Sequence, residues 1–336
     1  MDKFLRNSDQ EIHGLTPQML QRQAQRGTLL RLHNGLYVPP LTLTDGPTAL
    51  VASEFARRQW TQRLAGHLER AGSQSAISHR AAGERHGLEG IIGHHEDITV
   101  PRHCGWKTPP AIRSTLTADE IVPLTDLRVT SVERTLADMG RFIIADQLEF
   151  AVEHALRGAD RRRPDVWNED LLDRLLAIPA SSRRPGLSIL RTVLLRRGRE
   201  RPTGSYSETE LAQGLRVAGV MLVRQPTILV FSADGRLLHR FFPDFADLVR
   251  GLLIEVNGRA GHTGDDNIDR DDRRLNELSG AFNIQRYSAR QVHRDPVAVA
   301  SSIGGVQRML SNRSSPWFGP GTSVVLTTDG ANVWHR

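Results

Sequence analysis

The hydrophobic pattern near the N-terminus predicts a short amphipathic helix followed directly by a β-hairpin. Thr16 stands just before Pro17, which pairs a capping side chain with a residue suited to the first helical turn. Gly27 is placed to end this helix, because glycine adopts the left-handed backbone that often follows a helix at no steric cost. Two strand-forming runs come next, 29–32 and 36–38, and the Asn-Gly pair between them predicts a tight turn.

Helical periods dominate the middle of the chain. Apolar residues recur there every three or four positions, and Ser131 stands where it can cap a helix that turns Leu136 and Met139 inward. The predicted helices cover 46–71, 147–156, 169–176 and 187–195, and a further helix starts after Ser131 within the run 129–138. The basic segment 196–204 contains both Pro and Gly, and it indicates the last domain boundary.

The last third of the chain alternates between helical and strand periods. One helix is predicted over 205–219, and a second through the Asp- and Arg-rich segment that ends at Leu278. The predicted strands cover 222–223, 228–231, 237–242, the two segments around Asp244 and Glu255, and 283–287. From Pro296 onward the Ser-, Gly- and Thr-rich sequence has little helical period, so we expect a loosely packed tail.

Two carboxylates in strand-like surroundings are the strongest candidates for chemistry. Glu255 lies inside an apolar run, where an unpaired carboxylate is costly to desolvate. Asp244 lies eleven positions earlier, a spacing that accommodates a strand, a turn at 247–251 and a return strand. Two carboxylates brought together in this way suit Mg²⁺, which prefers one or two carboxylates plus water and phosphate oxygens. The alternative is a half-buried strand pair with incidental acids.

These acids belong to a larger pattern that resembles the PD-(D/E)xK nuclease superfamily. Asp244, the run Glu255-Val256-Asn257-Gly258 and His262 are similar to the motif of the group related to the very-short-patch-repair endonuclease. The resemblance extends back to Ser205-Tyr206-Ser207-Glu208, which is similar to the first helix of that group, and forward to Arg286-Tyr287-Ser288. It implies a restriction-endonuclease-like fold with elements in the order α-β-β-β-α-β.

The sequence departs from this family at the position of its lysine. Asn257 stands where the repair-endonuclease group has Asp and the wider superfamily has Lys. The chain contains two lysines, Lys3 and Lys107, and neither lies in this region. A catalytically degenerate domain is therefore the alternative to an active nuclease.

The resemblance implies roles for the candidate residues in metal-dependent phosphodiester hydrolysis. Asp244 and Glu255 would hold Mg²⁺ or Mn²⁺, and Glu208 would add a ligand or hold a water of the metal. Asn257 can orient the attacking water but cannot take its proton, so His262 is the candidate base. Two arginines of the charged segment could offset charge on the phosphate: Arg273 and Arg274.

The N-terminal helix and hairpin together match the pattern of a winged helix, and the segment 14–38 resembles the N-terminal domain of abortive-infection (AbiEi-type) antitoxins. The middle region is similar to the central part of the same antitoxin-like proteins, which often precedes a repair-endonuclease-like domain in one chain. In DNA-binding winged helices one helix enters the major groove while arginines hold phosphates. The candidate nucleic-acid residues are Arg22, Gln25, Arg26 and Arg31. The alternative is a winged helix used only for protein contacts.

Composition adds a bias toward nucleic acid. The chain of 336 residues has a formal net charge of +6 and a pI near 10.3, with almost all the positive charge on arginine. Arginine binds phosphate with two parallel hydrogen bonds, which favours a nucleic-acid partner, although a GC-rich genome gives the same bias. The single cysteine, Cys104, excludes an internal disulfide. No apolar run is long enough for a membrane span, so a cytoplasmic protein is expected.

The sequence therefore predicts a mixed α+β and α/β protein of four parts. These are a winged-helix segment at 1–72, an antitoxin-like middle region at 73–200, a nuclease-like domain at 201–296 and a tail at 297–336. The predicted function is DNA binding, with duplex DNA as the expected partner, coupled to a Mg²⁺- or Mn²⁺-dependent endonuclease in phage defence, a toxin–antitoxin system or DNA repair. The alternative is a winged-helix transcriptional regulator or antitoxin, and a toxin or another protein would then be a further partner.

Overall fold

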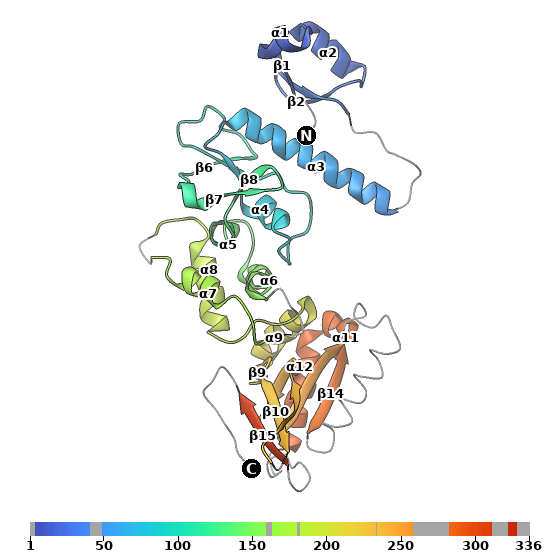
Figure 1. Cartoon of the computed structure of the whole chain (residues 1–336), viewed down its shortest axis with the longest axis vertical. Helices are drawn as coiled ribbons and strands as arrows, with labels where there is room; N and C mark the ends of the chain where they lie inside the picture. The colour runs from blue at the N-terminus through green and yellow to red at the C-terminus, as the bar shows by residue number, and fades with distance from the viewer. Residues whose placement is uncertain are drawn as a thin grey trace. The chain divides into compact units, whose positions relative to one another are not determined.

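The computed structural model describes residues 4–40, 49–158, 163–179, 182–232, 234–257, 282–310 and 322–327. Within these ranges the fold is mixed α+β, with helices and four β-sheets. Figure 1 shows the helices and strands in chain order. The chain divides into two compact units, Met1–Ile144 with Ser182–Leu190, and Ala145–Ser181 with Arg191–Arg336. The finer division into four parts stays a prediction. Among the described residues, no helix is both long enough and apolar enough to cross a membrane.

The first unit begins with short helices and a small sheet of strand order β1-β3-β2. Its first elements are β1 (Leu5–Arg6), η1 (Asn7–Asp9), α1 (Gln10–His13), α2 (Pro17–Gln25), β2 (Leu30–His33) and β3 (Leu36–Val38). The predicted cap is confirmed, because the Thr16 side chain accepts a hydrogen bond from the N–H of Met19 at 3.3 Å. The predicted hairpin is confirmed too, since β2 and β3 pair antiparallel.

The rest of the first unit packs helices on a mixed five-stranded sheet of order β6-β5-β4-β8-β7. Its elements are α3 (Ala49–Ala71), β4 (Ala76–Ile77), α4 (His79–Arg85), β5 (Ile98–Val100), β6 (Ala111–Arg113), η2 (Ala118–Glu120), β7 (Ile121–Leu124), β8 (Leu127–Thr130) and α5 (Val132–Met139). Ser131 caps α5 as predicted, and Leu136 and Met139 are fully buried. Trp60 and Leu64 of α3 pack on the sheet in the hydrophobic core.

A buried ion network fastens α5 to the preceding segment. The guanidinium of Arg134 is almost completely buried and donates to Asp138 at 2.7 Å and to Glu120 at 2.8 Å. It also donates to the carbonyl of Thr115 and the hydroxyl of Ser114. Because its partners satisfy it on several sides, this cation is held in the interior as part of the fold.

The second unit contains two separate sheets and the helices around them. Its elements are α6 (Ala145–Leu156), α7 (Glu169–Leu176), α8 (Leu187–Arg197, which begins in the first unit), α9 (Tyr206–Ala218), β9 (Val223–Arg224), β10 (Thr227–Ser232), β11 (Leu237–Phe241), β12 (Phe245–Asp247), β13 (Leu252–Asn257), β14 (Asn283–Ser288), α11 (Ala289–Arg294), α12 (Pro296–Met309) and β15 (Thr322–Thr327). One sheet has the order β14-β13-β12-β9 and the other β11-β10-β15.

The two faces of the four-stranded sheet bury different partners. Phe245 and Ile254 point to one face, where they pack with residues of α9, α11 and α12. Ala246 and Leu253 point to the other face and pack with Ile228 of β10. Because side chains alternate along a strand, Glu255 of β13 points to this second face, away from the core that α9, α11 and α12 form.

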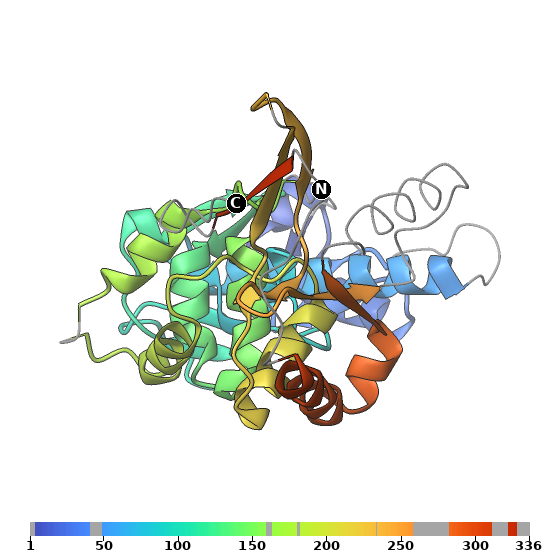
Figure 2. The same ribbon diagram turned by 90° about the horizontal axis from the view of Figure 1, so that it is seen from below.

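One expectation about this unit is wrong for the residues that the structure describes. Residues 296–309 are not part of a loose tail, since they form α12, a fourteen-residue helix that buries Ala300 and Ile303 against α9. The side chain of Asp295 caps this helix at the N–H of Ala298. The β10–β11 hairpin belongs to the other sheet, in which β10 also pairs antiparallel with β15 (Figure 2). The helix predicted to end at Leu278 lies outside the described residues.

Candidate functional site

The register of two antiparallel strands brings Asp244 and Glu255 together. Phe245 pairs with Ile254, so Asp244, one residue before β12, lies opposite Glu255 of β13. The predicted strand, turn and return strand are thus confirmed. The backbone fixes the orientation of Asp244 as well, because the N–H of Val256 donates to its Oδ2 at 2.6 Å.

Glu208 approaches the same point from the first turn of α9. Ser205 caps this helix, and its hydroxyl donates to Oε1 of Glu208 at 2.8 Å. The N–H of Gly204 donates to Oε2 at 2.6 Å. Glutamate is common at this third helical position because it helps to satisfy the free N–H groups of a helix start. The carboxylate of Glu208 therefore has a structural role, whatever chemistry it serves.

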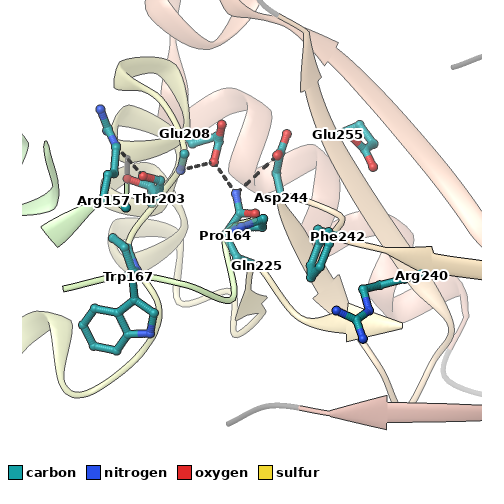
Figure 3. A pocket seen from close by; sticks show the side chains of 13 residues that line it. Arg157, Pro164, Trp167, Thr203, Glu208, Gln225, Arg240, Phe242, Asp244 and Glu255 are labelled. Atoms are coloured by element: carbon teal, nitrogen blue, oxygen red, sulfur yellow. Dashed lines mark hydrogen bonds between the residues drawn. The ribbon is translucent and has the colours of Figure 1, made fainter. Parts of the chain in front are cut away.

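Gln225 bridges buried Glu208 and half-buried Asp244, and we did not predict it. Its side-chain Nε2 donates to Oε2 of Glu208 at 2.7 Å and makes a longer contact of 3.4 Å with Oδ1 of Asp244 (Figure 3). Its backbone is held in the left-handed region at φ 45°, which is uncommon for a residue other than glycine. The backbone N–H of Gln225 donates to the carbonyl of Asp244, and its own carbonyl accepts from Arg201 at 2.8 Å. Strain of this kind persists where the surroundings over-determine it, often at functional sites.

The electrostatics of the site favour protonation or a bound cation. Burial raises the pKa of Asp244 well above its usual range, and the charges of Glu208 and Glu255 raise it further. The hydrogen bonds from Val256 and Gln225 oppose this rise without cancelling it. Burial also raises the pKa of Glu208, against the hydrogen bonds from Ser205 and Gly204 and the charge of Arg157. The fold therefore holds the carboxylates of Glu208, Asp244 and Glu255 near one another although their negative charges repel.

The acids line one end of a cavity of about 470 Å³ that lies within the second unit. Arg157 and Arg240 also line it, as do the aromatic side chains of Trp167 and Phe242 (Figure 3). Arg157 is oriented by its Nε, which donates to the carbonyl of Thr203 at 2.6 Å. The cavity thus combines carboxylates, guanidinium groups and aromatic faces, which are the groups that bind cations, phosphates and bases respectively.

A buried carboxylate of α6 holds the segments that position these residues. Glu153 is completely buried and accepts from Arg197 and Arg224, each at 3.1 Å. It also accepts from the N–H of Thr203 at 3.1 Å. Arg224 immediately precedes Gln225, so this one carboxylate fixes both the chain leading to Gln225 and the chain leading to Glu208.

The remaining predicted catalytic residues divide between described and undescribed segments. Asn257 ends β13, and its amide, in the orientation that satisfies its neighbours, accepts from Arg286 at 3.1 Å from Nε and 2.9 Å from Nη2. This contact directs the oxygen of Asn257 toward a guanidinium. His262, Arg273 and Arg274 lie outside the described residues.

The donor set fits a divalent cation held by two carboxylates. Asp244 and Glu255 line the same cavity, and Mg²⁺ needs one or two carboxylates with water completing its shell. A cation beside Oδ1 of Asp244, where the contact with Gln225 is long, would relieve the repulsion that raises the pKa of Asp244. Among the described residues, no group of three or more His, Cys, Asp and Glu side chains could hold a metal ion. Glu208 is engaged by its own donors, so it fits this site as a neighbour of the cation.

The candidate nucleic-acid residues lie in the first unit on an exposed surface. Arg22 and Gln25 lie on α2, Arg26 follows directly after it, and Arg31 lies on β2. All four are exposed. The side chain of Arg31 donates to Asn34 at 2.6 Å, which turns it toward the hairpin.

Comparison with known proteins adds no relative. No protein-family model matches this sequence, and no curated protein is significantly similar to it.

Proposed function

We propose that the second unit is a metal-dependent phosphodiesterase that acts on nucleic acid, and that the N-terminal helix and hairpin are a DNA-binding winged helix. The observation that carries the proposal is the convergence of Asp244 and Glu255 beside buried Glu208. Burial and mutual repulsion raise the pKa of Asp244, so the chain maintains an arrangement that a cation would stabilise. A restriction-endonuclease-like fold would put its acids on one sheet and one flanking helix in the same way.

The residues of the cavity have separate tasks in this proposal. Asp244 and Glu255 would hold one divalent cation, which would supply positive charge for a phosphate oxygen. Arg157 and Arg240 bind the phosphates on either side of the scissile bond. Trp167 and Phe242 offer faces on which unstacked bases can lie. Gln225 holds Glu208 and Asp244 apart and positions them, and His262 accepts the proton of the attacking water.

A second candidate function is a regulator whose nuclease-like domain has lost catalysis. The contact between Asn257 and Arg286 favours it, because the amide occupies the position at which the superfamily has a lysine. The bridging amide of Gln225 favours it as well, since an amide donor between two acids replaces part of what a cation would do. Against it, the regulator has no need to keep Asp244 and Glu255 facing one cavity.

Plasmid nicking with Mn²⁺ or Mg²⁺ and with EDTA separates these functions. We expect the wild type to nick DNA only with the metal, and Glu255→Ala to abolish nicking because the cation loses a charged ligand. His262→Ala should lower the rate by roughly 10²–10⁴, the range for loss of a general base. Asp173→Ala removes an exposed acid of α7 that does not line the cavity, and it serves as the matched control.

Each outcome supports a different function. An inert wild type that gains activity on Asn257→Asp would identify a silenced nuclease and support the regulator. If neither the wild type nor Asn257→Asp cleaves double-stranded or single-stranded substrates, the phosphodiesterase proposal is refuted. If the wild type is active and His262→Ala cleaves DNA at the same rate, the protein is a nuclease but His262 is not its general base.

The winged helix is tested separately by DNA binding as a function of salt. Replacing both Arg22 and Arg26 with Ala should weaken duplex binding and flatten the slope of log K against log salt by about 0.9 for each phosphate that the protein no longer neutralises. Binding that is independent of salt, or absent at low salt, would mean that this surface serves protein contacts.

A further inference from the structure

A second cavity, of about 500 Å³, lies in the first unit and gathers three arginines. Arg57 and Arg58 come from α3, and Arg85 from the end of α4. The turn between β7 and β8 closes another side with Thr125 and Asp126. Of the described residues that line this cavity, Asp126 is the one acid, so the positive charges outnumber the negative charges.

Arg85 is the most constrained of the three arginines. Its Nη1 donates to the hydroxyl of Thr61 at 3.4 Å, and its Nη2 donates to the hydroxyl of Thr125. Its Nε is buried and has no hydrogen-bond partner among the described residues. Burial lowers the pKa of Arg85, and the charge of Arg57 lowers it further, so this cation has neutral partners and a repulsive neighbour. Such a group is stabilised by an anion.

The two arginines of α3 are only loosely neutralised. Glu54 pairs with Arg57 at 2.8 Å and with Arg58 at 3.1 Å, one and the same carboxylate serving two cations. Both guanidinium groups are more than 60% exposed, at 62% and 63%, and exposed pairs of this kind contribute little energy. Each arginine has five N–H donors, so donors remain on both for a ligand.

We propose that this cavity binds a phosphate group. A phosphate presents three or four oxygens and can accept from three guanidinium groups at once, whereas a carboxylate has two oxygens. The volume of about 500 Å³ exceeds that of the ion alone and leaves room for the nucleoside or backbone attached to it. The phosphate comes from a nucleic-acid strand or from a free nucleotide. The inference is independent of the nuclease, because the cavity belongs to the other unit.

The test measures binding of three probes to the full chain by titration calorimetry: inorganic phosphate, adenosine monophosphate and a short DNA duplex. The double variant Arg57→Gln, Arg85→Gln should lose affinity for phosphate by roughly tenfold or more, since it removes charged hydrogen-bond donors. Arg85 is partly buried, so a second variant changes exposed positions only, Arg57→Gln with Arg58→Gln. Arg102→Gln is the matched control, because Arg102 is exposed and does not line the cavity.

The three probes also separate the sources of the phosphate. For a nucleic-acid strand, both double variants flatten the salt slope of duplex binding by about 0.9 for each phosphate left without its arginine. For a free nucleotide, they abolish binding of adenosine monophosphate and leave the duplex slope unchanged. The proposal is overturned if the wild type binds none of the probes, or if the folded exposed-position variant binds all of them as the wild type and Arg102→Gln do.

Discussion

The raised pKa of Asp244 is expected to make the stability of the second unit depend on pH. Its pKa is raised in the folded protein by burial first and by the charges of Glu208 and Glu255 next. The folded state therefore binds a proton that the unfolded state releases once the pH exceeds about 4. By linkage, stability is greatest below that pH and falls as the pH rises toward the raised pKa. Asp244→Asn removes this charge, and its amide oxygen can still accept from Val256.

The size of the effect follows from the number of protons. One proton bound on folding changes the free energy of unfolding by about 1.4 kcal/mol for each pH unit in the window. If Glu208, whose pKa is also raised, titrates in the same range, the slope approaches about 2.7 kcal/mol per pH unit. In the variant Asp244→Asn the slope of the unfolding free energy against pH should be smaller by at least the contribution of one proton. It should therefore be more stable than wild type at pH 8 and lose its advantage near pH 4.

Urea unfolding between pH 4 and 8 is the first assay, with hydrogen exchange as the local readout. The amide of Val256 reports directly, because its hydrogen bond to Asp244 is the one that the charge state affects. Asp173→Asn, at an exposed acid, should follow wild type throughout. Wild-type stability that rises from pH 4 to 7, or an Asp244→Asn variant less stable than wild type at pH 8 with the same slope, would refute this reasoning.

Three further changes test other parts of the structure. Gln225→Gly keeps the backbone at φ 45° without strain but removes the bridging amide, so urea unfolding at pH 7 should show a loss of about 1–3 kcal/mol that shrinks toward pH 4. Arg134→Met leaves Asp138 buried without its cation, while Glu120 keeps its ion pair with Arg184, and it should cost about 3–5 kcal/mol in the first unit. A change within about 0.5 kcal/mol would contradict a buried network. The hydrogen bond from His67 and the interaction with Arg63 lower the pKa of Glu96 to about 2. The stability that ionised Glu96 contributes is therefore fully present above about pH 4.5 and is lost as the pH falls through about 2. In acid titrations followed by circular dichroism, Glu96→Gln should thus differ from wild type at pH 6 and converge with it near pH 2.

Local signals in the sequence predicted much of the secondary structure. Thr16 and Ser131 were identified as caps because the capping interaction depends on residues three positions away. The number of residues between Asp244 and Glu255 in the sequence predicted that they lie on paired strands, since it suffices for one turn and two short strands. The convergence of Glu208 was expected only through a family resemblance, and no spacing along the chain required it.

What escaped prediction depends on contacts distant in sequence. The apolar face of α12 is diluted by serine and glycine, and the helix is buried because Gly214 of α9 lets Pro296 approach its backbone. Gln225 carries no local signal, because its role follows from a left-handed backbone and from two acids that come from other elements. Trp167 reaches the cavity in the same way, from a loop whose neighbours are set by the fold.

The late position of α12 and β15 in the chain has a consequence for protein synthesis. β15 supplies a partner to β10, and α12 covers α9, the helix that carries Glu208. A ribosome that has made the acids has therefore not yet made the residues that complete both layers around them. The part of the core that α12 covers stays exposed until residues 296–309 emerge, and exposed apolar surface of this kind favours aggregation during folding.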